Sequence, residues 1–227
     1  MVNATSQRDA RINQLIINSF ATDNIGLLYG KMGYALTFFY LSHGSEISKS
    51  SVFERYACDI LNDVLSSIPQ NCSFDFAHGL CGIGWGIDYL LKNQYVEGNS
   101  LEICKELDNE IMKINSKRLD DGLHFGLKGL LHYILIHLSN CMVVRSALPF
   151  DNQFLKDVHE TVCERLCLTE DRVLMELCKQ YEDFYNKKVY NYDYDIDICF
   201  EDIASNNKTY NGSCSLANGI CKQLILG

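Results

Sequence analysis

Proline is almost absent from this sequence, which has only Pro69 and Pro149 among its 227 residues. Because proline breaks helices by removing a backbone donor, little interrupts helix formation before Pro69 or between the two prolines. The sequence also lacks a run of about 18 apolar residues that could span a bilayer. Its first ten residues do not join a basic region to an apolar stretch, as a secretory signal does. We therefore expect no membrane span and a cytoplasmic location.

Positive charge is also scarce. Lys and Arg number 20 against 29 Asp and Glu, which gives a formal net charge of −9. Binding of nucleic-acid phosphates requires clustered basic side chains, so we expect no nucleic-acid partner. Apolar residues make up 47% of the chain, enough for a continuous core.

The eleven cysteines contain no Cys-x-x-Cys pair, and their number is odd. Several stand inside amphipathic patterns, where a thiol behaves as a small buried apolar group. Reduced thiols of a cytoplasmic protein are the simplest interpretation, because cytosolic proteins rarely keep disulfides.

A repeated pattern, x-Gly-x-x-Gly, sets the organisation of the chain. The first glycine of each copy stands at positions 30, 79, 126 and 219, and the last copy lacks the second glycine. The intervals are close to one or two periods of about 47 residues, a length typical of stacked helical units. The double interval predicts a degenerate copy near residue 172, where residues 170–179 are helical in pattern without glycines.

Each unit is predicted to contain two helices. Strongly apolar segments follow the glycines and indicate inner helices buried on most sides, at residues 35–41, 87–91 and 130–138. Segments with a single apolar stripe lie between them and indicate outer helices, at residues 8–20, 52–66, 101–115 and 152–167. Ser50, Ser100 and Asp151 are predicted to cap three of the outer helices.

Residues 186–212 do not fit the repeat and are predicted to form an irregular acidic insertion. Asp193, Asp195 and Asp197 alternate there, but the glycine and glutamate of a calcium loop are missing. A solvated acidic segment is therefore expected. The whole chain, residues 1–227, is predicted to be a single all-α domain of (α/α) helical-hairpin repeats.

The segment 76–86, Phe-Ala-His-Gly-Leu-Cys-Gly-Ile-Gly-Trp-Gly, carries a family resemblance. With the other glycine copies in frame, it resembles the Ala-His-Gly-x-x-Gly motif of the lanthionine synthetase C-like (LanC-like) family. The segment also resembles the inner-helix signature of shortened members of the kind found in Bacteroidetes. The resemblance implies a toroid in which the entrances to the inner helices face a common centre. Five units of this length fill the chain, so the implied ring is incomplete.

The same resemblance implies a chemistry. Classical LanC-like enzymes use zinc to activate a peptide cysteine, which adds to a dehydrated serine or threonine. Carried onto this chain, it makes His78 and His124 the candidate catalytic residues. The residues just before the other first glycines, Tyr29, Phe125 and Asn218, become candidate substrate-binding residues. Zinc is the implied cofactor, with His78, His124 and Cys214 as its candidate ligands.

Two hypotheses follow. The family's Trp-Cys-x-Gly and Cys-His-Gly motifs are absent, which favours a degenerate peptide-binding or accessory module of a peptide-modification system. The alternative is a zinc-dependent cyclase that forms lanthionine-type thioethers. In either case the implied partner is a precursor peptide. A homodimer or a partner subunit would cover the open edge of the ring, because exposed apolar surface of that size is usually covered.

Other features are assigned structural roles. The glycines are attributed to close packing and not to phosphate binding, since no Lys-Ser/Thr follows them. His132 and His137 are expected in the core or at its rim. Trp85, the one tryptophan, is expected to be wedged between helices.

Overall fold

The computed structural model describes residues 4–44, 47–143, 148–187, 190–200 and 214–226. Within these ranges the regular secondary structure is entirely helical, which confirms the predicted all-α class. Of the helices in the described ranges, none has both the length and the apolar character needed to cross a bilayer.

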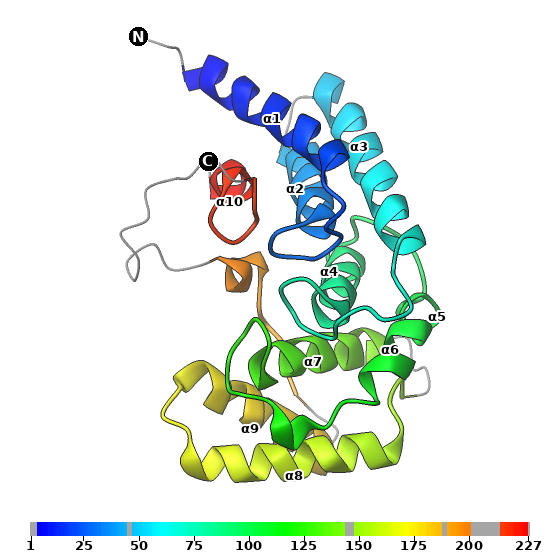
Figure 1. Cartoon of the computed structure of the whole chain (residues 1–227), viewed down its shortest axis with the longest axis vertical. Coiled ribbons are helices and arrows are strands. Elements are labelled where there is room, and N and C mark those ends of the chain that lie inside the picture. The colour runs from blue at the N-terminus through cyan, green and yellow to red at the C-terminus, as the bar shows by residue number, and fades with distance from the viewer. Residues whose placement is uncertain (1–3, 45–46, 144–147, 188–189, 201–213, 227) are drawn as a thin grey trace. The chain divides into compact units, whose positions relative to one another are not determined.

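The chain forms two compact units, which are described one at a time (Figure 1). Unit 1 comprises Met1–Cys72 and Tyr194–Gly227, and unit 2 comprises Ser73–Asp193. Unit 1 is therefore assembled from two distant parts of the sequence, whereas unit 2 is continuous. The single domain expected over residues 1–227 stays a prediction.

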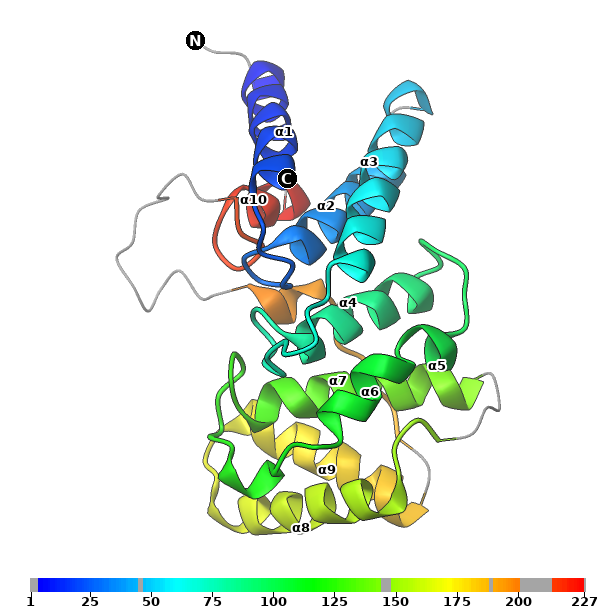
Figure 2. The same ribbon diagram turned by 45° about the vertical axis from the view of Figure 1, so that its right-hand side comes forward.

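Unit 1 is built around α2, Lys31–Gly44, which is buried on nearly all sides as expected of an inner helix. Two amphipathic helices, α1 (Ala4–Ala21) and α3 (Ile47–Ser66), run beside it, and they contain the predicted outer segments. The short α10 (Ile220–Leu226) packs against α1 and α2 although it comes from the other end of the sequence (Figure 2).

Unit 2 contains a row of three helices. The first two, α4 (Leu80–Lys92) and α7 (Leu127–Val143), are inner helices, and the third, α9 (Arg172–Lys187), buries one face. The amphipathic α8 (Asn152–Leu168) packs against α9, and the two lie side by side in both views (Figures 1 and 2). The degenerate copy predicted near residue 172 is thus a helix, and its buried face consists of Leu174, Leu177, Cys178, Tyr181 and Phe184.

The outer helix predicted at residues 101–115 is wrong as a single element. The chain there forms α5 (Ser100–Ile103), α6 (Lys105–Ile111) and a 3₁₀ turn, η1 (Ser116–Arg118). In an unbroken helix, Ser100 and Asp108 would point about 80° apart around the axis. The break after Ile103 lets both side chains reach one buried histidine, described below.

One of the three predicted helix caps is confirmed. Asp151 Oδ1 accepts a hydrogen bond from Phe154 N at 2.7 Å at the start of α8. Ser50 is not a cap, because α3 already begins at Ile47. Ser100 is not a cap either: Asn99 caps α5, and the Ser100 hydroxyl donates to a buried carboxylate instead.

The glycine loops share one backbone turn. In the first three copies the N–H after the first glycine donates to a carbonyl seven residues earlier. The bonds are Lys31 to Asn24 at 2.8 Å, Leu80 to Ser73 at 2.8 Å and Leu127 to Asp120 at 2.7 Å. A Cβ on the first glycine would collide with that same carbonyl oxygen in each copy. The prediction that the glycines serve close packing is therefore confirmed.

Neighbouring loops also contact one another in a repeated way. In unit 2 the N–H groups of Phe76 and Ala77 donate to His124 O, at 2.8 and 3.3 Å. In unit 1 the equivalent N–H groups of Leu216 and Ala217 donate to Leu28 O, also at 2.8 and 3.3 Å. The same loop-to-loop contact therefore occurs twice. In unit 1 the loop before α10 packs on the loop before α2, and in unit 2 the loop before α4 packs on the loop before α7.

The second glycine lies at these same loop contacts. A Cβ on Gly129 would lie 2.6 Å from Phe76 Cβ, and one on Gly33 would lie 3.1 Å from Leu216 Cβ. The second glycine of the motif thus allows one loop to approach the start of the neighbouring inner helix.

The acidic insertion predicted at residues 186–212 is only partly solvated. Asp193, Asp195 and Asp197 are exposed, as expected. Tyr192 is buried, however, and the 3₁₀ turn η2 (Ile196–Cys199) buries both of its end residues. Acidic and apolar residues alternate in this segment, so its acidic side chains face solvent while several apolar side chains are buried. Residues 188–189 and 201–212 of the predicted insertion lie outside the described residues.

Candidate functional site

His78 and Phe125, two of the residues predicted to share a site, lie together in unit 2. Each immediately precedes the first glycine of its copy, at the entrances to α4 and α7. Their rings stack with centroids 6.3 Å apart and planes 29° from parallel. Both side chains are exposed, and Phe125 leaves 55% of its surface open to solvent.

His124 joins this pair from the neighbouring position. Its ring meets Phe125 edge to face, with centroids 6.2 Å apart, and its side chain is half-buried. We call His78, His124 and Phe125 the entrance cluster. Hydrogen bonds hold the backbone of this cluster. His78 N donates to Oδ1 of the buried Asp75 at 2.6 Å, and His124 O accepts from the loop before α4.

The remaining predicted site residues lie in unit 1. Tyr29 is half-buried at the entrance to α2. Asn218 is half-buried before α10, and its Oδ1 accepts from Ser215 Oγ at 2.8 Å. Cys214 is buried, and its sulfur accepts from Asn18 Nδ2 at 3.0 Å.

Cys214 is a protonated thiol in this environment. Burial raises the pKa of its thiol, and the bond from Asn18 only partly opposes that shift. Of the three candidate zinc ligands, His78 and His124 belong to unit 2 and Cys214 to unit 1. Their joint role as a zinc site stays a prediction.

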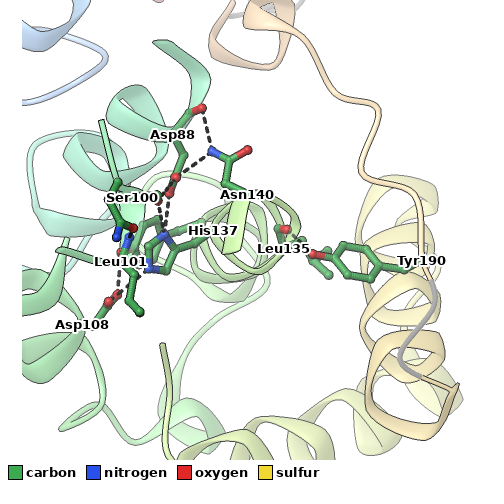
Figure 3. Close-up of polar contacts among 10 residues, drawn as sticks. Asp88, Ser100, Leu101, Asp108, Leu135, His137, Asn140 and Tyr190 are labelled. Carbon is green, nitrogen blue, oxygen red and sulfur yellow. Dashed lines mark hydrogen bonds and ion pairs between the residues drawn. The ribbon is translucent and has the colours of Figure 1, made fainter. Parts of the chain in front are cut away.

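A second group of polar residues, which the sequence analysis missed, lies inside unit 2 (Figure 3). His137 of α7 contacts a carboxylate on each side of its ring. Nδ1 is 2.8 Å from Asp88 Oδ2, and Nε2 is 3.1 Å from Asp108 Oδ2. All three side chains are buried. We call Asp88, Asp108 and His137 the buried ion cluster.

Neighbouring side chains satisfy the other carboxylate oxygens. Asn140 Nδ2 donates to Asp88 Oδ1 at 2.7 Å and to Asp88 O at 2.9 Å, and the Ser100 hydroxyl also donates to Oδ1. The Tyr133 hydroxyl donates to Asp108 Oδ1 at 2.6 Å. Buried charges are tolerated when they are paired and hydrogen-bonded in this way. The cluster therefore ties α4, α5, α6 and α7 together.

The histidine of this cluster carries a positive charge at neutral pH. Burial alone would lower its pKa, but the adjacent Asp88 and Asp108 outweigh burial and raise the pKa of His137 to about 10. Both ring nitrogens then hold protons and donate to the two carboxylates. The cluster holds one positive and two negative charges in the interior.

The cluster contains the elements of a nucleophilic triad but cannot act as one. Ser100 Oγ lies 2.9 Å from His137 Nδ1, while Asp108 holds the other ring nitrogen. A general base needs a free lone pair on its ring, and the imidazolium of His137 has none. The Ser100 proton is directed at Asp88, and its side chain is buried away from any substrate.

The same charge state also argues against metal binding. Among the described residues, Asp88, Cys104 and His137 bring one donor atom each to within 4.8 Å of one another. A metal ion would have to displace the imidazolium proton and that of the Cys104 thiol, whose pKa burial raises well above its ordinary value. The donors are already paired through protons, and we assign the cluster a structural role.

One signal for this cluster was present in the sequence. Asp88 and His137 each interrupt a strongly apolar helix, and a charge in such a position requires a buried partner. His137 is in the core, as expected, but its pairing with Asp88 depends on how α4 and α7 are packed.

Trp85 is fully buried in α4, as predicted, and it forms part of a third polar contact. Its Nε1 donates to the Tyr192 hydroxyl at 2.8 Å, and that hydroxyl lies 2.9 Å from His132 Nδ1. Burial lowers the pKa of His132 to about 3, so the neutral ring accepts the Tyr192 proton. This contact holds the segment after α9 against α4 and α7.

These sites divide by accessibility: the entrance cluster faces solvent, whereas the buried ion cluster and the Trp85 contact hold unit 2 together. Comparison of the sequence with descriptions of known protein families gave no match, and comparisons with curated proteins and with solved structures gave none either.

Proposed function

We propose that this chain is a peptide-binding module of the LanC-like type, serving as a degenerate accessory member of a system that modifies ribosomally synthesised peptides. Its hairpins would form an incomplete ring of about five units, with a second copy or a partner subunit on the open edge. The peptide would contact His78 and Phe125 at the inner-helix entrances of unit 2, and Tyr29 and Asn218 of unit 1 stay predicted peptide contacts.

The exposed entrance cluster is the observation that carries this proposal. Phe125 is a large apolar residue, yet more than half of its surface faces solvent beside two imidazoles. Aromatic rings anchored on a rigid backbone provide contact area with little loss of side-chain freedom. The Asp75 and His124 backbone bonds supply that rigidity.

Binding is favoured over acid–base catalysis by the location of the charged groups. The two histidines with strongly shifted pKa values, His132 and His137, are both buried, and His137 is already paired with two carboxylates. The histidines of the entrance cluster, His78 and His124, contact an aromatic ring. This arrangement suits recognition of an apolar or aromatic peptide side chain.

The proposal is tested by selection from a phage-displayed library of random peptides on the immobilised full chain. We expect enriched peptides to carry aromatic or aliphatic side chains and to bind the Phe125→Ala variant at least about tenfold more weakly, as a lost aromatic anchor would require. Leu168→Ala is the matched control, because Leu168 is an exposed apolar residue on α8, 75% accessible and outside the entrance cluster. Enriched peptides that bind both variants equally would contradict the proposal.

The zinc-dependent cyclase remains the second candidate, favoured by two imidazoles that contact the same Phe125 ring. Zinc would lower the pKa of a peptide thiol, and Cys214 would be the third ligand implied by the resemblance. This candidate predicts about one zinc per chain that is lost in His78→Ala, measured by elemental analysis of purified protein. Zinc that is retained in His78→Ala would count against it.

A further inference from the structure

Unit 1 contains a pair of loops that is built like the pair carrying the entrance cluster of unit 2. In each unit, two successive N–H groups of one loop donate to a single carbonyl oxygen of the other, at 2.8 and 3.3 Å in both cases. We call the loops that supply the N–H groups the donor loops, and they comprise residues 73–79 and 214–219. The loops that supply the carbonyl are the acceptor loops, residues 24–30 and 120–126.

The two donor loops share an internal turn. In unit 2, His78 N donates to Asp75 Oδ1 at 2.6 Å, and the N–H of the following glycine donates to Asp75 O at 3.1 Å. In unit 1, Asn218 N donates to Ser215 Oγ at 3.3 Å, and the N–H of the following glycine donates to Ser215 O at 3.0 Å. Asn218 therefore occupies in unit 1 the position that His78 occupies in unit 2.

The two acceptor loops match in the same way. Asn24 Oδ1 accepts from the N–H two residues further on at 2.9 Å, and Asp120 Oδ1 accepts from the N–H two residues further on at 2.7 Å. Both residues stand six positions before the first glycine of their copy. Tyr29 therefore occupies in unit 1 the position that Phe125 occupies in unit 2.

This equivalence indicates that Tyr29 and Asn218 are neighbours. In unit 2 the side chains at the two positions stack, with ring centroids 6.3 Å apart. In unit 1 the residue before each member of the pair takes part in the loop-to-loop contact, since Ala217 N donates to Leu28 O at 3.3 Å. Tyr29 and Asn218 are both half-buried, so solvent reaches part of each side chain.

The chemistry of this pair differs from that of the entrance cluster. Phe125 has no hydrogen-bonding group on its ring, whereas Tyr29 carries a hydroxyl that can both donate and accept. Asn218 directs its Oδ1 toward Ser215 Oγ, 2.8 Å away, and this turns Nδ2 to the other side of the carboxamide. The pair therefore presents an amide donor close to a phenol.

A primary carboxamide matches these two groups. Its oxygen and one of its N–H bonds lie on the same edge, so it can accept from an amide and donate to a hydroxyl at once. A backbone amide is trans and holds its oxygen and its N–H on opposite edges. A carboxylate could accept from both groups, but the chain has a net charge of −9, which repels acidic peptides.

We propose that Tyr29 and Asn218 form a second peptide-binding site, in unit 1, which takes the side-chain carboxamide of an asparagine or glutamine. Asn218 Nδ2 donates to the oxygen of that carboxamide, and the carboxamide N–H donates to the Tyr29 hydroxyl. This site rests on the proposed peptide-binding function and adds a specificity to it. Unit 2 takes an apolar or aromatic side chain, and unit 1 takes an amide.

Selection of the phage-displayed library on the immobilised Phe125→Ala chain tests this site, because the aromatic anchor of unit 2 is then missing. We expect the enriched peptides to carry Asn or Gln at one position. Adding Asn218→Asp should weaken their binding at least about tenfold, because it keeps the acceptor for Ser215 and replaces the Nδ2 donor by a carboxylate oxygen. Adding Tyr29→Phe should weaken it about fivefold, as expected for one lost hydrogen bond.

Asn62→Asp is the matched control, because Asn62 is exposed on α3 of the same unit and lies outside both loops. Exchanging the selected Asn or Gln of the peptide for Leu should abolish the difference between Asn218→Asp and Asn62→Asp, which a purely structural role of Asn218 would not do.

Three results would overturn the second site: equal binding by Asn218→Asp and Asn62→Asp, enrichment of Asp or Glu in place of Asn or Gln, or no enriched peptide. Failure of the entrance cluster as a peptide site is seen in a separate measurement. It would appear as equal binding of wild-type-selected peptides by Phe125→Ala and Leu168→Ala.

Discussion

At the residue scale, the main feature of unit 2 is a charged group placed within apolar helices. Asp88 and His137 are both fully buried, and each would be costly to bury alone. Together with Asp108 they form a network whose hydrogen bonds are satisfied. Removing one member leaves the others buried without a partner, which typically costs about 3–5 kcal/mol.

The pH dependence of stability follows from His137. Its pKa is about 10 in the folded chain, above the ordinary value of 6.5 in the unfolded chain. The stabilisation is therefore fully present below about pH 6.5 and is lost as the pH rises through about 10. Urea unfolding at a series of pH values should show the free energy of unfolding falling over that range by a few kcal/mol, at about 1.4 kcal/mol per unit of pKa shift.

Other groups that face His137 add to this decline. Burial raises the pKa values of Cys104 and Tyr133 in the folded chain well above their ordinary values, so both ionise first in the unfolded chain and also lower stability at alkaline pH. The contribution of His137 is therefore the difference between the wild type and a variant that lacks the imidazole. The control is His137→Gln, which should be less stable at neutral pH and should lose the alkaline decline attributable to the imidazolium. An identical decline in both proteins would assign it to other groups.

Individual site residues were predictable only where the glycine frame fixed them. His78 and Phe125 occupy equivalent positions in two copies, and their loops meet because the copies pack in register. Asp108 and Ser100 lie outside the repeated glycine pattern, so no equivalent position predicted them. Their side chains reach His137 only because the outer helix breaks, and local sequence preference favoured a continuous helix.

At the element scale, the shared turn explains why the loops repeat more faithfully than the helices. In each loop the residue after the first glycine donates its N–H to the carbonyl seven residues earlier. The glycine lies against that same carbonyl oxygen, so its position has no room for a side chain. Apolar periodicity predicted the inner helices well, because that signal is local. Cap assignment succeeded at Asp151. It failed at Ser50 because α3 begins earlier in the sequence, and at Ser100 because its hydroxyl serves a buried carboxylate instead.

Replacement of Gly79 by alanine should therefore destabilise the chain strongly. The new Cβ would press on the Ser73 carbonyl, which is backbone and cannot rotate away. We expect a loss of about 2–4 kcal/mol in the free energy of unfolding, measured with urea, as for other overpacked sites. Gly44→Ala is the matched control, because nothing lies within 4 Å of a Cβ there. That change should be neutral or should stabilise α2 by up to about 1 kcal/mol.

A loss of similar size in both glycine variants would contradict the packing role of the loop glycine. It would show that alanine acts through a general effect of glycine replacement. Equal stability of Gly79→Ala and the wild type would show that the Ser73 carbonyl moves aside.

At the scale of the whole molecule, the division into two units gives them different requirements for folding. The contacts described for unit 2 all lie within Ser73–Asp193. They are the loop hydrogen bonds to His124 O, the buried ion cluster and the Trp85–Tyr192 contact. Unit 1 depends on α10 and the loop before it: the loop supplies the donors to Leu28 O, and α10 packs against α1 and α2. The sequence showed the repeats but not this division, because the interval between copies does not reveal which copies pack together.

The isolated segment 73–193 should therefore fold on its own. We expect it to show helical circular dichroism and one cooperative transition in urea. Segment 1–72 should show weaker helicity and a broad transition, because the partner of its α2 loop is missing. A cooperative transition in segment 1–72 alone, or none in segment 73–193, would contradict this division.

The pairing of α10 with α2 also affects how a nascent chain folds during translation. Residues 24–44 leave the ribosome early, yet the partner of their loop emerges only after all of unit 2 has been made. For that interval the apolar surface of α2 that α10 later covers is open to chaperones or to other nascent chains. Slow synthesis of the segment between unit 2 and α10 would prolong that exposure, so the yield of native protein should depend on the translation rate of that part of the message.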